Sequence, residues 1–198
     1  MSVRAQIFVE GIADVKFLQD YLKHLGIEDV LVSEMGGKDK IVETKINFEF
    51  NYRNKSGIKN LLIIDADSDY KKRRQELDEI DFLEEYEVAS FLFPNDKDSG
   101  DLEILLEQII NPKNTAIFDC WNGYETCLSE KEDALTATGK YTTPARKTKI
   151  YAYLEALLDT SKNQKEKIKE PNRDYLNKDH WDLNADYLNP LKEFIQQI

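Results

Sequence analysis

The sequence predicts an α/β fold: a four-stranded parallel sheet in the order 2-1-3-4, flanked by helices and followed by a helical extension. Two observations lead to this prediction. Short apolar runs typical of strands alternate with segments whose apolar residues recur every three or four positions, as in amphipathic helices. Acidic residues follow the first and third apolar runs, where a parallel strand gives way to its crossover helix. We therefore expect an α/β core over residues 1–110 and a helical extension over 111–198, packed on that core.

The elements of the core follow from these patterns. The run AQIFV predicts the first strand, and the apolar residues after it keep helical spacing up to Gly26, which can end a helix. The run LLII is continuous and apolar, as expected of a strand buried on both faces. Strands are expected at 5–9, 30–33, 61–64 and 88–93, and helices at 12–25, 38–50, 70–80 and 101–110.

Beyond residue 111 the pattern is mainly helical. We expect helices at 115–128 and 144–158, and a last short helix at 187–198. The stretch SKNQKEKIKEPNRDYLNKD, residues 161–179, is polar, and we expect it to be a loop. We expect these helices to form an extension packed on the α/β core, not an independent domain.

The composition indicates a globular protein and argues against several other classes of protein. A chain of 198 residues, 41% hydrophobic and 33% charged, can bury a sizeable core. No apolar run approaches the roughly 20 residues of a membrane span, and the N-terminus enters a strand pattern without the plan of a signal peptide. Cys120 and Cys127 form no CxxC motif. We therefore expect a cytoplasmic protein without a membrane segment, disulfide framework or zinc site.

The charge is strongly acidic but unevenly distributed. The formal net charge is −11, from 27 basic and 38 acidic residues, and such a surface repels nucleic acid at long range. The basic residues gather in two groups, which consist of Lys71, Lys72, Arg73 and Arg74 and of Arg146, Lys147 and Lys149. Each group could bind phosphate locally, or could simply be the solvated face of a helix.

Carboxylates follow two strands that should be neighbours. Glu10 ends the first strand, with Asp14 one helical turn further on, and Asp65 ends the third. If that strand continues, Asp67 shares a face with Asp65, and Asp69 begins the next helix. In the order 2-1-3-4 both clusters meet where the strand order reverses, which is where such sheets bind ligands. Converging carboxylates without a nearby histidine favour a hard cation, Mg²⁺ or Mn²⁺.

Simpler explanations exist for each acid taken alone. Glu10 could be a helix-start acid that the helix dipole favours, and Asp67 or Ser68 could cap the following helix. The acids from Asp65 to Glu76 also match several positions of a calcium-binding EF-hand loop. That interpretation fails because Tyr70 stands where the loop requires glycine, and because a strand precedes it instead of a helix.

The two acidic motifs, FVEG and IIDAD, resemble those of the Toprim domain, which topoisomerases, bacterial primases, recombination mediators and OLD-family nucleases share. The Glu-Gly-x-x-Asp form, from Glu10 to Asp14, is more similar to the OLD-family nuclease branch. The segments SGDLEILLEQI, KTKIYAYLEAL and HWDLNADYLNPLKEFI are similar to those of small stand-alone Toprim-like proteins. The motifs cover about the first 110 residues, and the resemblance implies a Toprim/Rossmann-like core.

The resemblance also implies roles for the acids. Glu10 would be a metal ligand or a general acid/base, and Asp65 and Asp67 would bind Mg²⁺ or Mn²⁺. Asp14 and Asp69 are candidates for a second metal position. The implied catalytic set is thus Glu10, Asp14, Asp65 and Asp67, and the implied metal ligands are Glu10, Asp65, Asp67 and Asp69.

Further candidates keep two interpretations each. Glu103 could reach the same edge or only cap its helix. Lys147 or Lys149 could supply the basic residue that OLD-like nucleases place near the scissile phosphate, and the run from Lys71 to Arg74 could follow a phosphate backbone. Exposed helix faces explain both basic groups more simply.

Other family parts are missing from this chain. It has no obvious domain with a topoisomerase nucleophile, no zinc-binding module and no P-loop, so an ATPase would have to be a separate partner chain. The expected function is Mg²⁺-dependent, nuclease-like phosphodiester hydrolysis on DNA or RNA. The alternatives are a non-catalytic Toprim module that binds nucleic acid or a protein partner, and phosphoryl transfer on a small nucleotide.

Overall fold

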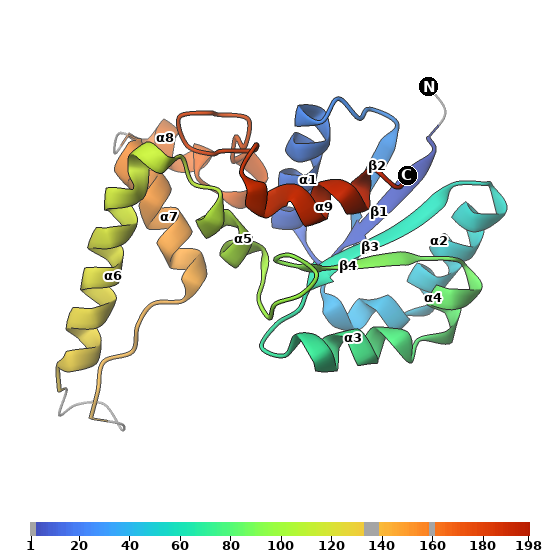
Figure 1. Ribbon diagram of the computed structural model, residues 1–198, viewed down its shortest axis with the longest axis horizontal. Coiled ribbons are helices and arrows are strands. Elements are labelled where there is room, and N and C mark those ends of the chain that lie inside the picture. The colour runs from blue at the N-terminus through green and yellow to red at the C-terminus, as the bar shows by residue number, and fades with distance from the viewer. Residues whose placement is uncertain (1–2, 133–138, 159–160) are drawn as a thin grey trace.

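The computed structural model describes residues 3–132, 139–158 and 161–198. Its centre is a four-stranded, all-parallel sheet in the order β2-β1-β3-β4 (Figure 1). The strands are β1 (Ala5–Val9), β2 (Val30–Glu34), β3 (Lys59–Asp65) and β4 (Ala89–Phe93). The predicted α/β class and strand order are confirmed.

Helices cover both faces of the sheet (Figure 1). The α-helices are α1 (Ile12–His24), α2 (Thr44–Lys55), α3 (Tyr70–Asp78), α4 (Asp81–Glu85), α5 (Leu102–Gln108), α6 (Thr115–Glu130), α7 (Arg146–Leu157), α8 (Lys162–Lys167) and α9 (Asn189–Ile195). Short 3-10 helices span Lys38–Val42, Pro112–Asn114, Glu170–Asn172 and Asp186–Leu188. None of the helices within the described residues has the length and apolarity that a bilayer crossing requires.

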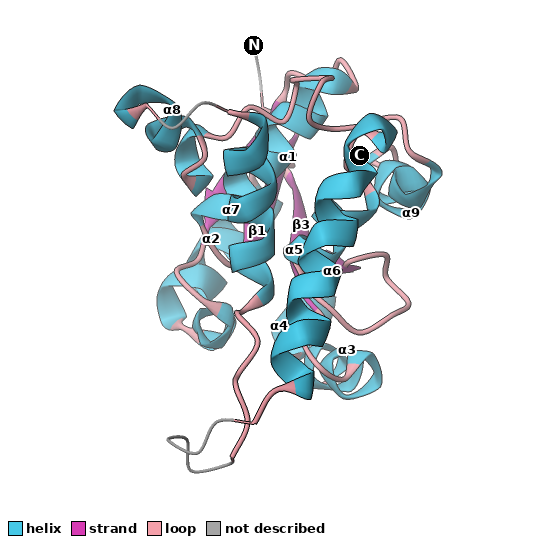
Figure 2. Cartoon of the chain, turned by 90° about the vertical axis from the view of Figure 1, so that its left-hand side faces the viewer, coloured by secondary structure: helices cyan, strands magenta, loops and turns pink. Residues whose placement is uncertain are grey.

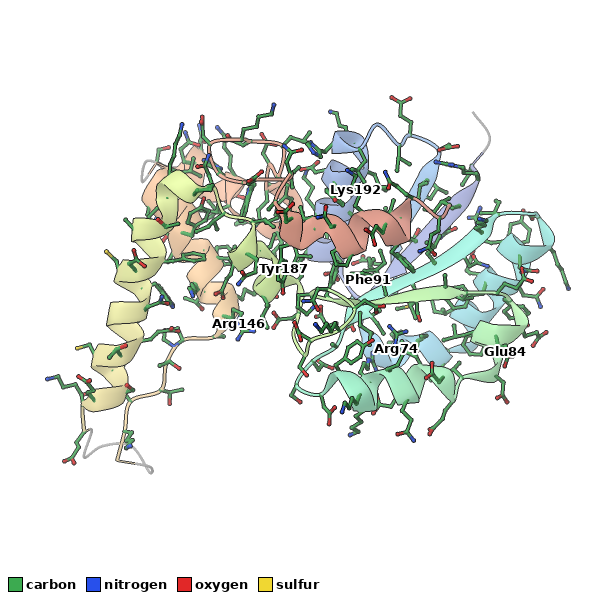
Figure 3. The ribbon with its side chains drawn as sticks, in the orientation of Figure 1. Arg74, Glu84, Phe91, Arg146, Tyr187 and Lys192 are labelled. Carbon is green, nitrogen blue, oxygen red and sulfur yellow. The ribbon has the colours of Figure 1, made fainter. Side chains whose placement is uncertain are left out.

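The side chains of each strand alternate between two separate apolar layers. Ile7 and Phe91 face the layer that contains α1, α5 and α9, and Phe8 faces the layer that contains α2, α3 and α4. Aromatic contacts fix both layers: Phe8 lies 4.5 Å from Phe50, and Phe91 lies 5.4 Å from Phe194 of α9, between ring centroids (Figure 3). Burial on both faces explains why the central strands are continuous apolar runs.

The C-terminal half of the chain shares the first of these layers. Tyr153 of α7, Tyr175 and Trp181 are buried in the same apolar cluster as α1 and β1. Figure 2 shows α6 and α7 side by side, and Figure 1 places them at the opposite end of the molecule from α2 and α4. At the other end of the extension, the Arg4 guanidinium donates to the carbonyl oxygen of Ile198 at 3.0 Å. The extension therefore completes the core layer that the sheet begins.

One predicted helix is divided in two. The sequence pattern predicts a single helix over 38–50, but this segment forms the 3-10 helix Lys38–Val42, a break at Glu43, and then α2. Glu43 has an extended backbone, with φ −69° and ψ 144°. Apolar spacing does not indicate the break, because 3-10 and α-helices both place residues three apart on one side. The sequence pattern also gives no sign of the short helix α4.

A second error concerns residues 161–179, for which the sequence predicts a loop. This segment contains α8 and the 3-10 helix Glu170–Asn172, and it buries Ile168, Arg173 and Tyr175. Its order comes from packing against α1 and α7, a tertiary effect that a polar sequence pattern does not indicate. The correction matters because this segment reaches the candidate site.

The loop between β4 and α5 depends on a glycine. Gly100 has φ +150° and forms an isolated bridge with Asp67. A Cβ added there would lie 2.4 Å from Cδ1 of Ile104 and 3.1 Å from Cδ of Pro94. Both the backbone conformation and the space therefore require glycine.

Gly100→Ala should lower the free energy of unfolding by about 1–3 kcal/mol, because it combines an unfavourable φ with a steric clash. Chemical denaturation of the two proteins measures this difference. Gly123→Ala is the matched control: Gly123 lies within α6 with open space around its Cα, so alanine should stabilise the protein by about 0.5–1 kcal/mol. An unchanged stability of Gly100→Ala would contradict the proposed constraint.

Candidate functional site

Parallel pairing brings two acidic strand ends to one edge of the sheet. Val9 lies opposite Ile63, so Glu10, just after β1, and Asp65, at the end of β3, reach the same edge. The backbone N–H of Asp65 donates to Oε1 of Glu10 at 3.3 Å. Oδ1 of Asp65 in turn accepts from the backbone N–H of Leu102 at 3.1 Å. These bonds join the ends of β1 and β3 to the start of α5.

Asp14 lies beside this edge of the sheet, on α1. It lies in the first turn of the helix, and its Oδ2 accepts from the backbone N–H of Gly11 at 2.9 Å. The residue is only 8% exposed. Burial raises the pKa of Asp14 to about 7, and the charges of Glu10, Glu103 and Glu170 add to the rise, which the hydrogen bond from Gly11 partly offsets.

Asp65 is more strongly perturbed. Burial raises the pKa of Asp65 to about 9, with the negative charges of Asp14, Glu10, Asp101 and Glu103 contributing to the rise. Burial, followed by the charge of Asp101, also raises the pKa of Glu103, which lies in the first turn of α5. Burial and mutual repulsion therefore disfavour the ionised forms of these carboxyl groups. Asp101 itself caps α5, where its Oδ1 accepts from the backbone N–H of Ile104 at 2.9 Å.

One arginine of the basic run lies next to Glu10. Nη2 of Arg73 is 3.6 Å from Oε1 of Glu10, and the Arg73 side chain is only 12% exposed. Among the described residues, neither Nε nor Nη2 of Arg73 has a hydrogen-bond partner. The other members of the run face elsewhere: Lys71 and Lys72 are exposed, and Arg74 binds Ser90 of β4 and Asp96 in the loop after β4 (Figure 3).

Asp67 would share a face with Asp65 only if the strand continued, and it does not. The strand ends at Asp65, and Asp67 has a left-handed backbone with φ +54° and an exposed side chain. Asp69 is also exposed, and its Oδ1 caps α3 by accepting from the backbone N–H of Lys72 at 3.1 Å. The helix cap is thus Asp69, where the sequence suggested Asp67 or Ser68. Both acids belong to the loop beside the buried cluster.

The two candidate lysines of α7 have different partners, and only one is connected to the carboxylate cluster. Lys147 forms an ion pair with Glu170, whose negative charge raises the pKa of both Asp14 and Glu103. Lys149 instead binds Oε2 of Glu107 at 2.8 Å and Oδ1 of Asn122 at 3.3 Å. Lys147 is therefore connected to the edge of the carboxylate cluster, whereas the contacts of Lys149 lie with α5 and α6.

Residues 170–175 also contribute to the candidate site, which the sequence patterns did not predict. Burial raises the pKa of Tyr175 to about 12, the neighbouring Arg173 partly offsets this, and the charges of Glu103 and Asp14 add to it. The backbone N–H of Tyr175 donates to Oδ2 of Asp20 at 2.9 Å, which anchors the segment to α1. The apolar residues Ile168, Tyr175 and Leu176 within this polar stretch were the available signal.

The donor set fits a hard divalent cation. The converging groups are carboxylates, and Mg²⁺ is commonly held by one or two carboxylates, with water and substrate phosphate completing its shell. Within the described residues, no three acidic, histidine or cysteine side chains form a ready metal-binding group. Glu10 and Asp65, joined by a hydrogen bond, are the pair best placed to begin one. A cation there would favour the ionised carboxylates, whose pKa values burial and mutual repulsion raise.

The metal-free protein should lose stability as the pH rises from about 4 to about 9. Native Asp14 and Asp65 keep their protons up to pKa values of about 7 and 9, whereas their ordinary value is 3.8. The native state binds more protons in this range, so the free energy of unfolding falls, by up to about 1.4 kcal/mol per pH unit for each group.

Urea denaturation in EDTA at several pH values measures this loss. Asp65→Asn should flatten the dependence above pH 7, because it removes the carboxyl with the highest pKa. A wild type and Asp65→Asn with the same pH dependence would contradict the assignment.

Comparison with known proteins gave a match at the level of the family. A family model described as "Protein of unknown function (DUF3226)" matches residues 4–198. Searches of curated proteins and of solved structures returned no match. The matched range includes the sheet, the carboxylate cluster and the segment that carries Arg173 and Tyr175. The chain therefore belongs to the DUF3226 family.

Proposed function

We propose that this protein is a Toprim-like phosphodiesterase that uses Mg²⁺ or Mn²⁺ to hydrolyse DNA or RNA. The observation that carries the proposal is the convergence of Glu10, Asp14 and Asp65 where the strand order reverses between β1 and β3. The pKa values of Asp14 and Asp65 are raised, first by burial and then by neighbouring carboxylates, and a bound cation would lower them. Perturbed carboxyls gathered at such a position favour a functional site.

Glu10 and Asp65 are the proposed cation ligands, and Asp67 and Asp69, on the exposed loop after β3, are the proposed additional ligands. A bound divalent cation would polarise a phosphoryl oxygen and make water a stronger nucleophile. The hydrogen bond from the Asp65 backbone orients Glu10 toward this edge. The α5 backbone N–H that binds Asp65 orients the second ligand. The chain thus fixes both carboxylates from neighbouring strands.

Asp14 and Arg73 complete the proposed mechanism. A carboxyl with a pKa of about 7 can accept or release a proton near neutral pH, which suits Asp14 to general acid/base work. The guanidinium of Arg73 forms ion pairs with Glu10 and Glu76, and in the proposed mechanism it would bind a phosphate oxygen. Glu103 and Lys147, which lie at the edge of the cluster, would tune its charge.

A non-catalytic module that binds nucleic acid or a protein partner is the second candidate. The contact between Arg73 and Glu10 favours it, because an internal cation already balances part of the charge that a metal would neutralise. The net charge of −11 also opposes a broad nucleic-acid surface. Phosphoryl transfer on a small nucleotide would need the same carboxylates. Activity assays distinguish these functions.

Glu10→Gln should reduce phosphodiesterase activity by at least about 100-fold, because it keeps the shape of the side chain but removes the charge and the base. The assay uses single- and double-stranded DNA and RNA with Mg²⁺ or Mn²⁺. The variant should fold normally, since glutamine can still accept the hydrogen bond from Asp65.

Glu34→Gln is the matched control, because Glu34 ends the neighbouring strand β2 at the same edge but is exposed. It should keep full activity. Asp20 is unsuitable as a control, because it binds both Lys16 and the Tyr175 backbone. Full activity in folded Glu10→Gln would refute the proposed role, and inactive wild type on all four substrates would favour the non-catalytic module.

Mg²⁺ or Mn²⁺ should stabilise the native protein. Binding to the native state alone adds about 1.4 kcal/mol at a cation concentration of ten times Kd. Asp65→Asn combined with Asp67→Asn should raise the melting temperature without metal, because it removes repulsion, and should abolish the response to metal. Thermal melts with EDTA and with millimolar cation test both statements. A wild type that responds to neither cation would contradict the metal site.

A further inference from the structure

The two outermost strands of the sheet, β2 and β4, differ in how their outer sides are covered. At β4, the backbone N–H of Leu92 donates to Oδ1 of Asp96 at 2.9 Å, and the carbonyl oxygen of Leu92 accepts from the backbone N–H of Asp96 at 2.7 Å. Arg74 binds both Asp96 and Ser90 of the same strand. The loop after β4 therefore occupies the position that a further strand would take.

The outer side of β2 has no such cover. The backbone N–H of Met35, just after β2, donates to the carbonyl oxygen of Val9, so the odd-numbered residues of this segment direct their backbone groups toward β1. The backbone groups of Val30, Val32 and Glu34 therefore point away from the sheet. Within the residues that the structure describes, none of these groups has a hydrogen-bond partner. An unpaired strand of this kind can accept another strand.

The side chains of β2 also leave this strand open. Leu31 is 41% exposed, Glu34 is exposed, and Val30 and Val32 are only half-buried, whereas every residue of β1 is buried. The sequence VLVSE contains no lysine, arginine or proline, the residues that commonly protect an outer strand from pairing. The outer side of β2 is therefore both accessible and unprotected.

Antiparallel pairing with a second copy of β2 gives each of these backbone groups a partner. When Val32 lies opposite Val32 of the second copy, Val30 lies opposite Glu34, and each facing pair exchanges two N–H···O=C bonds. Leu31 then lies opposite Ser33 and diagonal to Leu31 of the second copy, which brings the exposed apolar side chains together.

The local charge also fits a second copy. In this pairing no residue of β2 lies opposite a like charge, because Glu34 faces Val30. The helix α1, which packs on β2, has no exposed acidic side chain, since Asp14 and Asp20 are each 8% exposed. Two copies of a chain with a net charge of −11 therefore meet less repulsion here than at its acidic surfaces.

We propose that two copies of this protein associate through β2, so that their two sheets join into one continuous sheet. The two β2 strands are antiparallel, with a two-fold axis beside Val32. The carboxylate clusters of the two copies then lie at opposite ends of the joined strands, and the association does not depend on a bound metal. Because five residues form a small interface, the dimer should be weak and should dissociate on dilution.

Sedimentation equilibrium in EDTA, from low micromolar to near-millimolar protein, should show a monomer–dimer equilibrium. Leu31→Lys should weaken association by about tenfold or more, because it brings two like charges together at the joint. Val32→Pro should do the same, because it removes an N–H that the fold itself does not use. Tyr124→Lys, at an exposed position of α6, changes the net charge as Leu31→Lys does and should associate as wild type. A wild type that stays monomeric throughout, or a dimer that both β2 variants leave unchanged, would overturn the proposal.

Cysteine cross-linking tests the register of the two strands, in a protein that also carries Cys120→Ser and Cys127→Ser. Val32→Cys places two thiols at the two-fold axis, with Cα atoms about 5.5 Å apart, which a disulfide can bridge. Oxidation should therefore link this variant into a dimer. Leu31→Cys is the matched control: its Cα atoms would lie about 7–8 Å apart, too far for a disulfide without backbone movement. No cross-link in Val32→Cys, or equal yields from the two variants, would refute the proposed pairing.

Discussion

The parallel pairing of β1 with β3 is the constraint on which the candidate site depends. Because Val9 lies opposite Ile63, the residues that follow both strands emerge at one edge, and the Asp65 backbone can donate to Glu10. The same pairing places both strands between two apolar layers, so the edge cannot relax by moving either strand. Core packing, which stabilises the fold, thereby holds carboxylates together against their mutual repulsion.

Three features of the structure reduce the repulsion between these carboxylates. Protons are retained, since burial and neighbouring charges raise the pKa values of Asp14 and Asp65. Backbone N–H groups of Gly11 and Leu102 donate to the same two carboxylates. Arg73 approaches Glu10 from α3. A divalent cation would offset the same negative charge directly. This charge compensation is the physical basis of the metal-dependent function that we propose.

The C-terminal segment connects the helical extension to the candidate site. Residues 170–175 pack against α1, where Asp20 accepts from the Tyr175 backbone, and bring Glu170 near the carboxylate cluster. Arg173 lies in the same segment, and its charge lowers the pKa of Glu103.

The sheet and the first half of the site could be predicted from the amino-acid sequence alone. Apolar runs and helical spacing identify each strand, and the strand order follows from α/β topology, so the sequence alone places Glu10 and Asp65 at one edge. Local signals of this kind report which residues are buried, because burial sets the apolar pattern. Only the tertiary structure decided that Asp67 turns outward, that Arg73 alone of its run faces Glu10, and that Arg173 is buried. The reason is physical: a polar side chain looks the same in sequence whether water or another part of the protein surrounds it, and long-range packing makes that choice.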